Sequence, residues 1–417
     1  MPLNLEICFF VNPELFSGNS STKIYLNMTP PSAPSSESAT RERYAAAAAK
    51  PEAELCCPVD YDPKYLKAIP AEVIEKDYGC GDPSKHLHPG ETVLDLGSGT
   101  GKICFIASQV VGPNGKVIGV DMTDDMLEVS RRNAPIVAES IGHANVEFRK
   151  GRIQDLALDL EILDQELRKK PIADANAYLA VDALAAELRV KHPLIATDSI
   201  DVVVSNCVLN LVETHLKRQL FEEIFRVLKK GGRAVISDIV SDEEIPVHLQ
   251  NDAYLWSGCI SGAYTEEGFL TAFTEAGFHG IEILKRDDTP WQTVEGIEFR
   301  SVTIQAWKGK QGPCFERNQA VIYKGPFKKV LVDDGHALER GKRYAVCDKT
   351  FDLYHKTPYR EHFAFVEPLT PIVSDEAQPF DCSEMRERHP KETKGQDYNA
   401  TTETTTCCSG VDGASCC

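Results

Sequence analysis

The sequence has little of what marks a membrane protein, a fibre or a nucleic-acid-binding protein. Its apolar fraction of 42% and charged fraction of 26% are ordinary for soluble globular proteins, which excludes a membrane bundle, a collagen-like fibre and a wholly disordered chain. Positive charge is scarce, since 45 Lys and Arg stand against 63 Asp and Glu and give a net charge of −18. An acidic surface repels phosphate, so we expect neither nucleic acid nor a membrane as partner.

The N-terminus also lacks a convincing export signal. Met1–Phe16 has no basic start, carries Glu6 and Glu14, and contains only a short apolar run. The chain nevertheless has 14 cysteines. In a reducing compartment such cysteines indicate thiol chemistry or soft-metal binding rather than a disulfide framework. We therefore predict a cytoplasmic protein, with an organellar transit peptide as the alternative.

The composition changes along the 417 residues, which are enough for two or three domains. Five segments are predicted from these changes. They are a disordered leader (1–55), a cofactor-binding domain with a helical insertion at about 157–197 (56–242), a mixed α/β region (243–308), a small β-rich domain (309–370) and a flexible Cys-rich tail (371–417).

Short apolar runs alternate with helical stretches in the second segment, which is typical of βαβ units on a parallel sheet. The predicted fold class is therefore α/β, with a doubly wound Rossmann-like sheet. The predicted strands are Thr92–Leu96, Lys116–Val120, Val146–Arg149, Ile200–Ser205 and Arg233–Asp238.

A glycine-rich loop, Gly97–Gly101, follows the first predicted strand. Glycines let the backbone approach a ligand, and the helix that follows supplies unpaired N–H groups. The loop continues with Lys102 and Ile103, which fits neither a phosphate loop nor a dinucleotide fingerprint. Asp121 ends the second strand, where a carboxylate can bind both hydroxyls of a ribose. The pattern indicates a nucleotide-type cofactor.

This loop, read with Gly119-Val120-Asp121, resembles the S-adenosylmethionine site of class I methyltransferases. The resemblance implies that the cofactor lies on the loop, with its ribose at Asp121 and its amino-acid end near Asp95. The cofactor-binding residues that it implies are Asp95, Gly97, Ser98, Gly99, Gly101, Asp121, Met122, Arg152, Ile153 and Asn206.

Three cysteines stand in unusual settings: Cys80 between two glycines, Cys207 just past the fourth strand, and Cys259 in a segment rich in Gly and Ser. Ligands of doubly wound sheets bind beyond the carboxyl ends of the strands, so topology places Cys207 near the cofactor. For Cys207 alone, a buried and inert thiol is the alternative. The spacing of the three matches no zinc-finger pattern.

The segments CCPVDYDP, DYGCG, VLDLGSGTG, GVDMT, SNCVLNLV and CISGA together resemble the arsenite S-adenosylmethionine methyltransferases. The resemblance implies that 56–242 is the methyltransferase domain and that 243–308 is an arsenic-binding region. It implies that Cys80, Cys207 and Cys259 bind trivalent arsenic, which arrives as arsenite or as its thiol conjugate. Thiolates are soft ligands for a thiophilic centre, and three of them leave the arsenic lone pair free to attack the cofactor methyl.

The same resemblance implies a redox step after methyl transfer. A disulfide between Cys80 and either Cys56 or Cys57 would return the product to the trivalent state, and thioredoxin or glutathione would restore the thiols. We expect a monomer. Two alternatives stay open: a class I methyltransferase of a small organic substrate, with structural cysteines, and a metalloid-binding protein without turnover.

Overall fold

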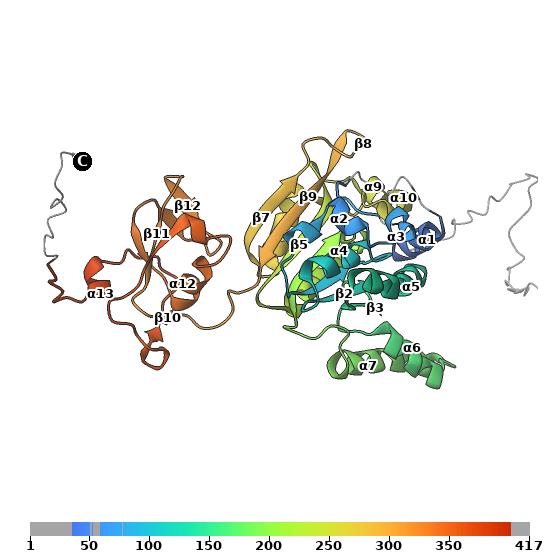
Figure 1. The fold of residues 1–417 in the computed structure, drawn as a ribbon, viewed down its shortest axis with the longest axis horizontal. Helices are drawn as coiled ribbons and strands as arrows, with labels where there is room; N and C mark the ends of the chain where they lie inside the picture. Colours follow the sequence, from blue (N-terminus) through green and yellow to red (C-terminus); the bar gives the residue numbers. More distant parts are fainter. Residues whose placement is uncertain (1–35, 51, 53–58, 77, 402–417) are drawn as a thin grey trace, which may run out of the picture. The chain divides into compact units, whose positions relative to one another are not determined.

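The computed structural model describes residues 36–401, apart from residues 51, 53–58 and 77. Cys56, Cys57 and the four cysteines after residue 401 lie outside the described residues. Along the described chain, a large sheet with its helices is followed by a small β-rich region (Figure 1).

A nine-stranded sheet organises the first of these parts. Its strand order is β3-β2-β1-β4-β5-β9-β7, with β6 beside β5 and β8 beside β9. Strands β1 to β5 pair in parallel, whereas β9 is antiparallel to its neighbours. The predicted doubly wound sheet is confirmed. The strands are β1 (Thr92–Leu96), β2 (Lys116–Asp121), β3 (Val146–Lys150), β4 (Ile200–Asn206), β5 (Leu228–Ser241), β6 (Tyr264–Thr265), β7 (His279–Arg286), β8 (Gln292–Val294) and β9 (Ile297–Trp307).

Helices cover both faces of this sheet because successive strand residues point to opposite sides. In β1, Val93 packs in the core beneath α4 and α5, whereas Leu94 and Leu96 pack in the core beneath α8 and α11. The helices of this part are α2 (Pro63–Leu66), α3 (Ala71–Glu75), α4 (Lys102–Val111), α5 (Asp124–Ile141), α8 (Lys217–Val227), α9 (Val247–Gln250), α10 (Ala253–Ser257) and α11 (Glu266–Glu275).

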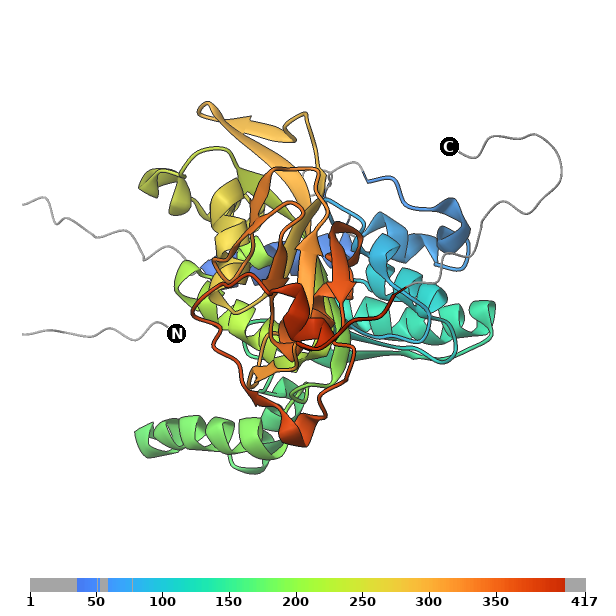
Figure 2. The same cartoon turned by 90° about the vertical axis from the view of Figure 1, so that its left-hand side faces the viewer.

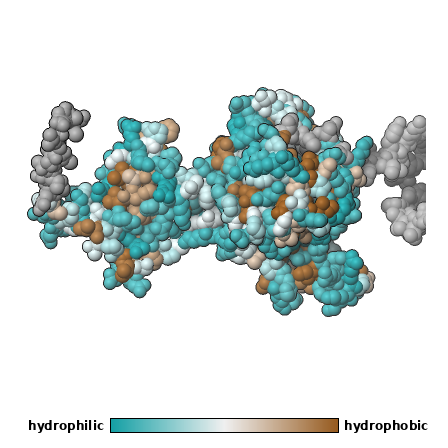
Figure 3. Space-filling model, viewed as in Figure 1, coloured by the Kyte–Doolittle hydropathy of each residue, from teal (hydrophilic) through white to brown (hydrophobic). Residues whose placement is uncertain are grey.

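The predicted insertion forms two helices, α6 (Leu160–Lys169) and α7 (Ala175–Lys191). Both ribbon views show them projecting from the end of the domain opposite β8 (Figures 1 and 2). Among the described residues, no helix has the length and hydrophobicity needed to cross a bilayer. The face seen in Figure 3 is mostly hydrophilic, with apolar residues in small separate patches.

The structure departs from the predicted disordered leader, because residues 36–49 form helix α1 (Ser36–Ala49). Alanine is the strongest helix former, and the run that begins at Ala45 favours this conformation. Ala47 and Ala48 are buried against Met126 of α5. A segment too poor in large apolar residues to fold alone is therefore stabilised by packing on the domain.

The small region is β-rich, as predicted. A three-stranded antiparallel sheet of order β14-β11-β15 packs on α12, around Val321, Phe351 and Phe363. Two further strand pairs are β10 with β16 and β12 with β13. The elements are β10 (Phe315–Glu316), β11 (Ala320–Tyr323), β12 (Lys329–Leu331), β13 (Ala337–Glu339), β14 (Arg343–Ala345), α12 (Asp348–Tyr354), β15 (Phe363–Val366), β16 (Gln378–Pro379) and α13 (Pro390–Lys394).

The predicted tail begins too early, because β16 and α13 lie in residues assigned to it. Arg388 is fully buried and makes two hydrogen bonds to the carboxylate of Glu316, at 2.6 and 2.7 Å. It also pairs with Glu392 at 3.1 Å. These charged contacts anchor the segment to β10, so its polar composition alone does not indicate a flexible tail.

Candidate functional site

The glycine loop turns tightly between β1 and α4. Gly97, Gly99 and Gly101 all have positive φ values, of 67°, 51° and 95°, which favour glycine. A Cβ on Gly97 would stand 2.4 Å from the Val208 side chain, whereas a Cβ on Gly99 would meet no atom within 4 Å. The first glycine is required by packing, and the backbone at Gly99 lies open to a ligand.

Asp121 is held against this loop at the end of β2. One carboxylate oxygen accepts the N–H of Gly99 at 2.9 Å, and the other accepts the N–H of Thr123 at 2.8 Å. Burial raises the pKa of Asp121 above its ordinary value, although these backbone hydrogen bonds act to lower it. The carboxylate is therefore oriented before any ligand arrives.

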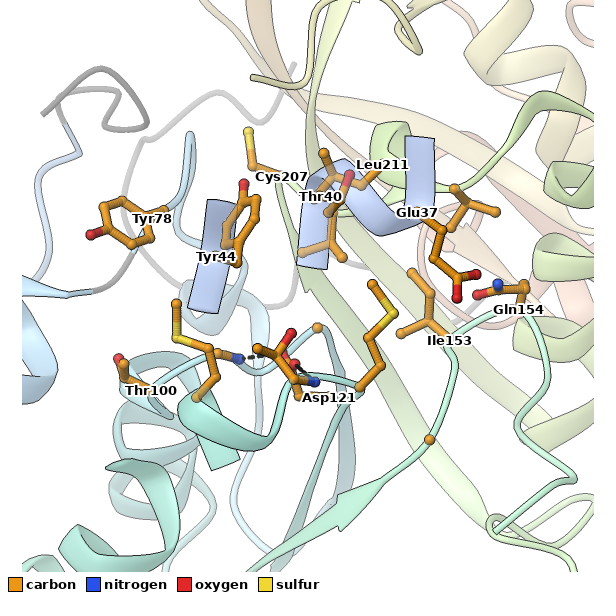
Figure 4. A pocket seen from close by; sticks show the side chains of 18 of the residues that line it. Glu37, Thr40, Tyr44, Tyr78, Thr100, Asp121, Ile153, Gln154, Cys207 and Leu211 are labelled. Atoms are coloured by element: carbon orange, nitrogen blue, oxygen red, sulfur yellow. Dashed lines mark hydrogen bonds between the residues drawn. The ribbon is translucent and has the colours of Figure 1, made fainter. Parts of the chain in front are cut away.

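A cavity opens in front of the loop and Asp121. Its walls come from the segments that follow β1, β2, β3 and β4, with α1 on a further side (Figure 4). This is the edge at which doubly wound sheets bind ligands. The lining residues are Glu37, Thr40, Tyr44, Lys76, Tyr78, Gly97, Gly99, Thr100, Asp121, Met122, Thr123, Met126, Gly151, Ile153, Gln154, Cys207, Val208, Leu211, Val212 and Glu213.

Half of the predicted cofactor residues are in this lining, namely Gly97, Gly99, Asp121, Met122 and Ile153. The other half are Asp95, Ser98, Gly101, Arg152 and Asn206, which the lining does not include. Asp95 is buried and accepts the Cys104 thiol at 3.2 Å. Arg152 forms an ion pair with Glu37 at 2.7 Å.

The Asn206 side chain is hydrogen-bonded to the loop that carries Cys80, and its predicted contact with a methionine moiety stays a prediction. Its amide oxygen accepts the backbone N–H groups of Cys80 and Gly81 at 2.9 and 3.0 Å. Its amide nitrogen donates to the Gly81 carbonyl at 2.8 Å and to the Tyr61 hydroxyl at 3.1 Å. A Cβ on Gly79 would lie 2.2 Å from the same amide. Asn206 therefore positions the loop that carries Cys80.

Helix α1 contributes side chains that the sequence reasoning missed. Thr40 and Tyr44 line the cavity (Figure 4), and Thr40 Oγ1 is buried without a hydrogen-bond partner among the described residues. The Tyr44 hydroxyl lies near the thiols of Cys259 and Cys207. Burial, and then the nearby thiols of Cys259 and Cys207, raise the pKa of Tyr44 well above its ordinary value. The alanine-rich run that begins at Ala45 was the one feature of the sequence that could have predicted this helix.

The neighbouring Arg43 fixes α1 beside Cys259. Its guanidinium donates to the Tyr254 carbonyl and to Ser257 Oγ, both at 3.0 Å, and lies 4.4 Å from the centre of the Tyr254 ring. Both partners belong to α10, which directly precedes Cys259.

Cys80, Cys207 and Cys259, hereafter the sheet-edge thiols, lie in one buried apolar cluster. The Cys259 thiol donates to the Cys207 carbonyl at 3.1 Å. Cys207 and Cys259 have positive φ values of 63° and 64°, which cost an ordinary residue roughly 1 to 2 kcal/mol. Strain of this kind gathers at functional sites. Among the described residues, these three sulfur atoms do not all lie within 4.8 Å of one another. They must therefore move closer together to bind a single arsenic atom.

Two buried ionisable side chains, Lys217 and Asp238, influence each other electrostatically, and Lys217 is also influenced by Cys259. Burial lowers the pKa of Lys217 to about 8, although Asp238 and Cys259 act to raise it. Burial raises the pKa of Asp238 to about 6, against the hydrogen bond from Ile239 and the charge of Lys217. Asp238 also accepts the side-chain amide of Asn210 at 2.9 Å.

Comparison with known proteins bears on this site. Residues 87–179 and 180–277 match a family described as a methyltransferase domain. An arsenite methyltransferase from Aquipseudomonas alcaligenes is 32% identical over 75% of this chain and 84% of its own length. The chain belongs to the arsenite methyltransferase family. A family member from Mus musculus is 28% identical over 77% of either chain.

A solved structure extends the likeness to the fold of the arsenite methyltransferases. An arsenic(III) S-adenosylmethionine methyltransferase from Chlamydomonas reinhardtii is 26% identical, has a TM-score of 0.51 and matches 78% of this chain and 100% of its own. The resemblance that the motifs predicted is thus confirmed, and so is the class I methyltransferase fold. Residues 310–398 match a second family, described as a domain of unknown function.

Proposed function

We propose that this chain transfers a methyl group from S-adenosylmethionine to trivalent arsenic held by Cys80, Cys207 and Cys259. The observation that carries the proposal is the position of Cys207, which lines the same cavity as the glycine loop and Asp121. A ligand on this thiol therefore faces the space that the cofactor would fill.

The residues of the cavity fit S-adenosylmethionine. The backbone at Gly99 has open space before it, and the oriented carboxylate of Asp121 suits ribose hydroxyls. The buried Thr40 hydroxyl has no protein partner among the described residues and offers a hydrogen bond inside the cavity. When bound, the cofactor supplies an electrophilic methyl group on a sulfonium.

The part that the chain itself plays in the reaction is to hold the arsenic and to align it with the cofactor methyl group. Three thiolates satisfy trivalent arsenic and leave its lone pair unused, so no general base is required. Asn206 fixes the Cys80 loop, and the left-handed backbone at Cys207 and Cys259 fixes the other two thiols. Well-aligned reactants can gain several kcal/mol from proximity. We expect most of the rate enhancement to come from this source.

Methyl transfer oxidises arsenic by two electrons, which must be returned. In our proposal Cys80 and either Cys56 or Cys57 supply both electrons by forming a disulfide, and thioredoxin or glutathione reduces that disulfide. We propose further that the protein acts as a monomer in the cytoplasm.

The test incubates the reduced protein with arsenite, S-adenosylmethionine and thioredoxin or glutathione, and separates the arsenic species by chromatography. Methylated arsenic is the expected product. Folded protein that binds the cofactor and yields none contradicts the proposal and favours a methyltransferase of a small organic substrate. Arsenite binding without cofactor binding would instead identify a metalloid-sequestering protein.

A further inference from the structure

A second group of three thiols lies in the small C-terminal region. The sulfur atoms of Cys314, Cys347 and Cys382, hereafter the C-terminal thiols, all lie within 4.8 Å of one another. No disulfide joins them. Cys347 is buried, Cys314 is partly buried and Cys382 is exposed, so the group reaches from the interior to the surface. All three belong to the segment that matches the domain of unknown function.

Backbone hydrogen bonds bring these cysteines together from three separate segments. The β10–β16 pair continues through the Phe380 N–H, which donates to the Cys314 carbonyl at 2.9 Å and places Cys382 nearby. The Phe315 N–H donates to Asp348 at 2.9 Å and connects the same strand to the start of α12. The arrangement is thus built by the fold rather than by the thiols themselves.

None of the three C-terminal thiols is in a disulfide, and the Cys347 thiol also accepts the Thr350 N–H at the start of α12. Although burial acts to raise it, the neighbouring thiols of Cys382 and Cys347 and the ammonium of Lys349 lower the pKa of Cys314. Cys347 and Cys382 line a small pocket. Sulfurs held about 2.3 Å from one metal ion stand roughly 3.8 Å apart. Small rotations of these side chains would close the group on a single atom.

The donor set decides what class of ligand fits. Among the described residues the group contains sulfur alone, whereas structural zinc takes four ligands. The nearby His336 ring is already hydrogen-bonded, through Nε2, to the Cys382 carbonyl at 3.0 Å. Three soft thiolates without a fourth ligand suit a three-coordinate thiophilic centre.

We propose that Cys314, Cys347 and Cys382 form a second site for trivalent arsenic, separate from the sheet-edge thiols. On binding arsenite, three S–As bonds form and three As–O bonds break, and the three thiol protons leave with the hydroxyls as water. No electron is transferred, so the site needs neither reductant nor methyl donor. It holds arsenic without turning it over.

The test is residue-resolved alkylation of the reduced full-length protein with N-ethylmaleimide, with and without arsenite, read by peptide mass spectrometry. Only free thiolate reacts, so arsenite is expected to slow alkylation of all three C-terminal thiols together by roughly tenfold or more. Zinc ions at the same concentration are expected to protect them less than arsenite does.

The variants Cys347→Ser and Cys382→Ser separate ligation from folding. Serine is a good N-cap, so Cys347→Ser keeps the acceptor for the Thr350 N–H at the start of α12. Either variant is expected to melt as the wild type does, yet to lose arsenite protection at the two remaining C-terminal thiols. Cys8→Ser removes one thiol elsewhere in the chain and is expected to leave that protection unchanged.

Each remaining outcome decides against a particular claim. Protection of the sheet-edge thiols without protection of the C-terminal thiols overturns the second site and leaves the proposed function standing. The reverse pattern supports the second site and contradicts the proposed arsenic ligands of the enzyme. Protection by zinc and not by arsenite overturns the assignment of trivalent arsenic.

Discussion

The sheet-edge thiols and the C-terminal thiols are built in opposite ways. The sheet-edge thiols lie in a buried apolar cluster, and two of these cysteines have left-handed backbone. Among the described residues, their three sulfur atoms do not all lie within 4.8 Å of one another. The C-terminal thiols already stand within that distance and reach the surface. We interpret the strained, adjustable set beside the cavity as the proposed reacting site, which must bind and release its ligand. A site that only holds its ligand can be pre-assembled.

The largest effect that tests this difference comes from Cys207→Ser. The hydroxyl is a poor ligand for arsenic, so we expect methyl transfer to fall by roughly 1,000-fold or more, as when a group in direct contact with the reacting atoms is removed. Arsenite protection of the C-terminal thiols is expected to persist. Product chromatography and residue-resolved alkylation measure the two effects. Wild-type turnover by Cys207→Ser would remove this thiol from the ligand set.

Asp121→Asn tests the cofactor side of the sheet-edge site. Both carboxylate oxygens of Asp121 accept a backbone N–H group, whereas the amide of asparagine has only one acceptor oxygen. The amide also lacks the charge that strengthens hydrogen bonds to ribose hydroxyls. We expect S-adenosylmethionine to bind about 30- to 100-fold more weakly by calorimetry, the loss of one or two charged hydrogen bonds. Asp164→Asn, an exposed change on α6, serves as the matched control. Equal affinities in both variants would contradict the assigned role.

The buried Lys217 gives the sheet-edge site a pH signature. Its pKa is lowered from 10.5 to about 8 in the folded chain, so between pH 8 and pH 10 the unfolded chain binds more protons. The free energy of unfolding should therefore rise with pH across this window, by about 2 kcal/mol. Lys217→Met should lack this rise, whereas Lys169→Met on α6 should keep it. Denaturant titrations at several pH values measure it, and identical slopes for wild type and Lys217→Met would refute it.

Tyr44→Phe has the smallest expected effect. It removes the hydroxyl that lies near the thiols of Cys259 and Cys207 and leaves the ring that lines the cavity. Loss of one polar contact costs about 1 kcal/mol, so we expect turnover to fall about fivefold with little change in cofactor affinity. Tyr178→Phe alters an exposed tyrosine of α7 and should change neither quantity. An unchanged rate for Tyr44→Phe would deny the hydroxyl any part in positioning Cys259.

The sheet and the cofactor loop could be predicted because their signals are local. A buried parallel strand such as Thr92–Leu96 reads as a short apolar run, and Gly97 and Asp121 each stand directly after such a strand. Helix α1 could not be predicted with its partners, since Ala47 becomes buried only when Met126 is in place. The end of the small region could not be predicted either, because it depends on the ion pair between Arg388 and Glu316.

The two thiol sites differ in the same respect. Cys80, Cys207 and Cys259 could be grouped because the motifs around them resemble a known family. Cys314, Cys347 and Cys382 are far apart in the sequence and stand in no such motif. Their grouping follows from the pairing of β10 with β16 and from the contact with the start of α12. Such pairings depend on tertiary structure, which residue spacing does not encode.

The central claim is that arsenic binds at the sheet-edge thiols, in front of the cofactor cavity. Crystals grown with arsenite and S-adenosylhomocysteine, measured at the arsenic absorption edge, test it most directly. We predict an anomalous peak bonded to the sulfurs of Cys80, Cys207 and Cys259, and a second peak at Cys314, Cys347 and Cys382. Arsenic at the second position with none beside the bound cofactor product would contradict the account.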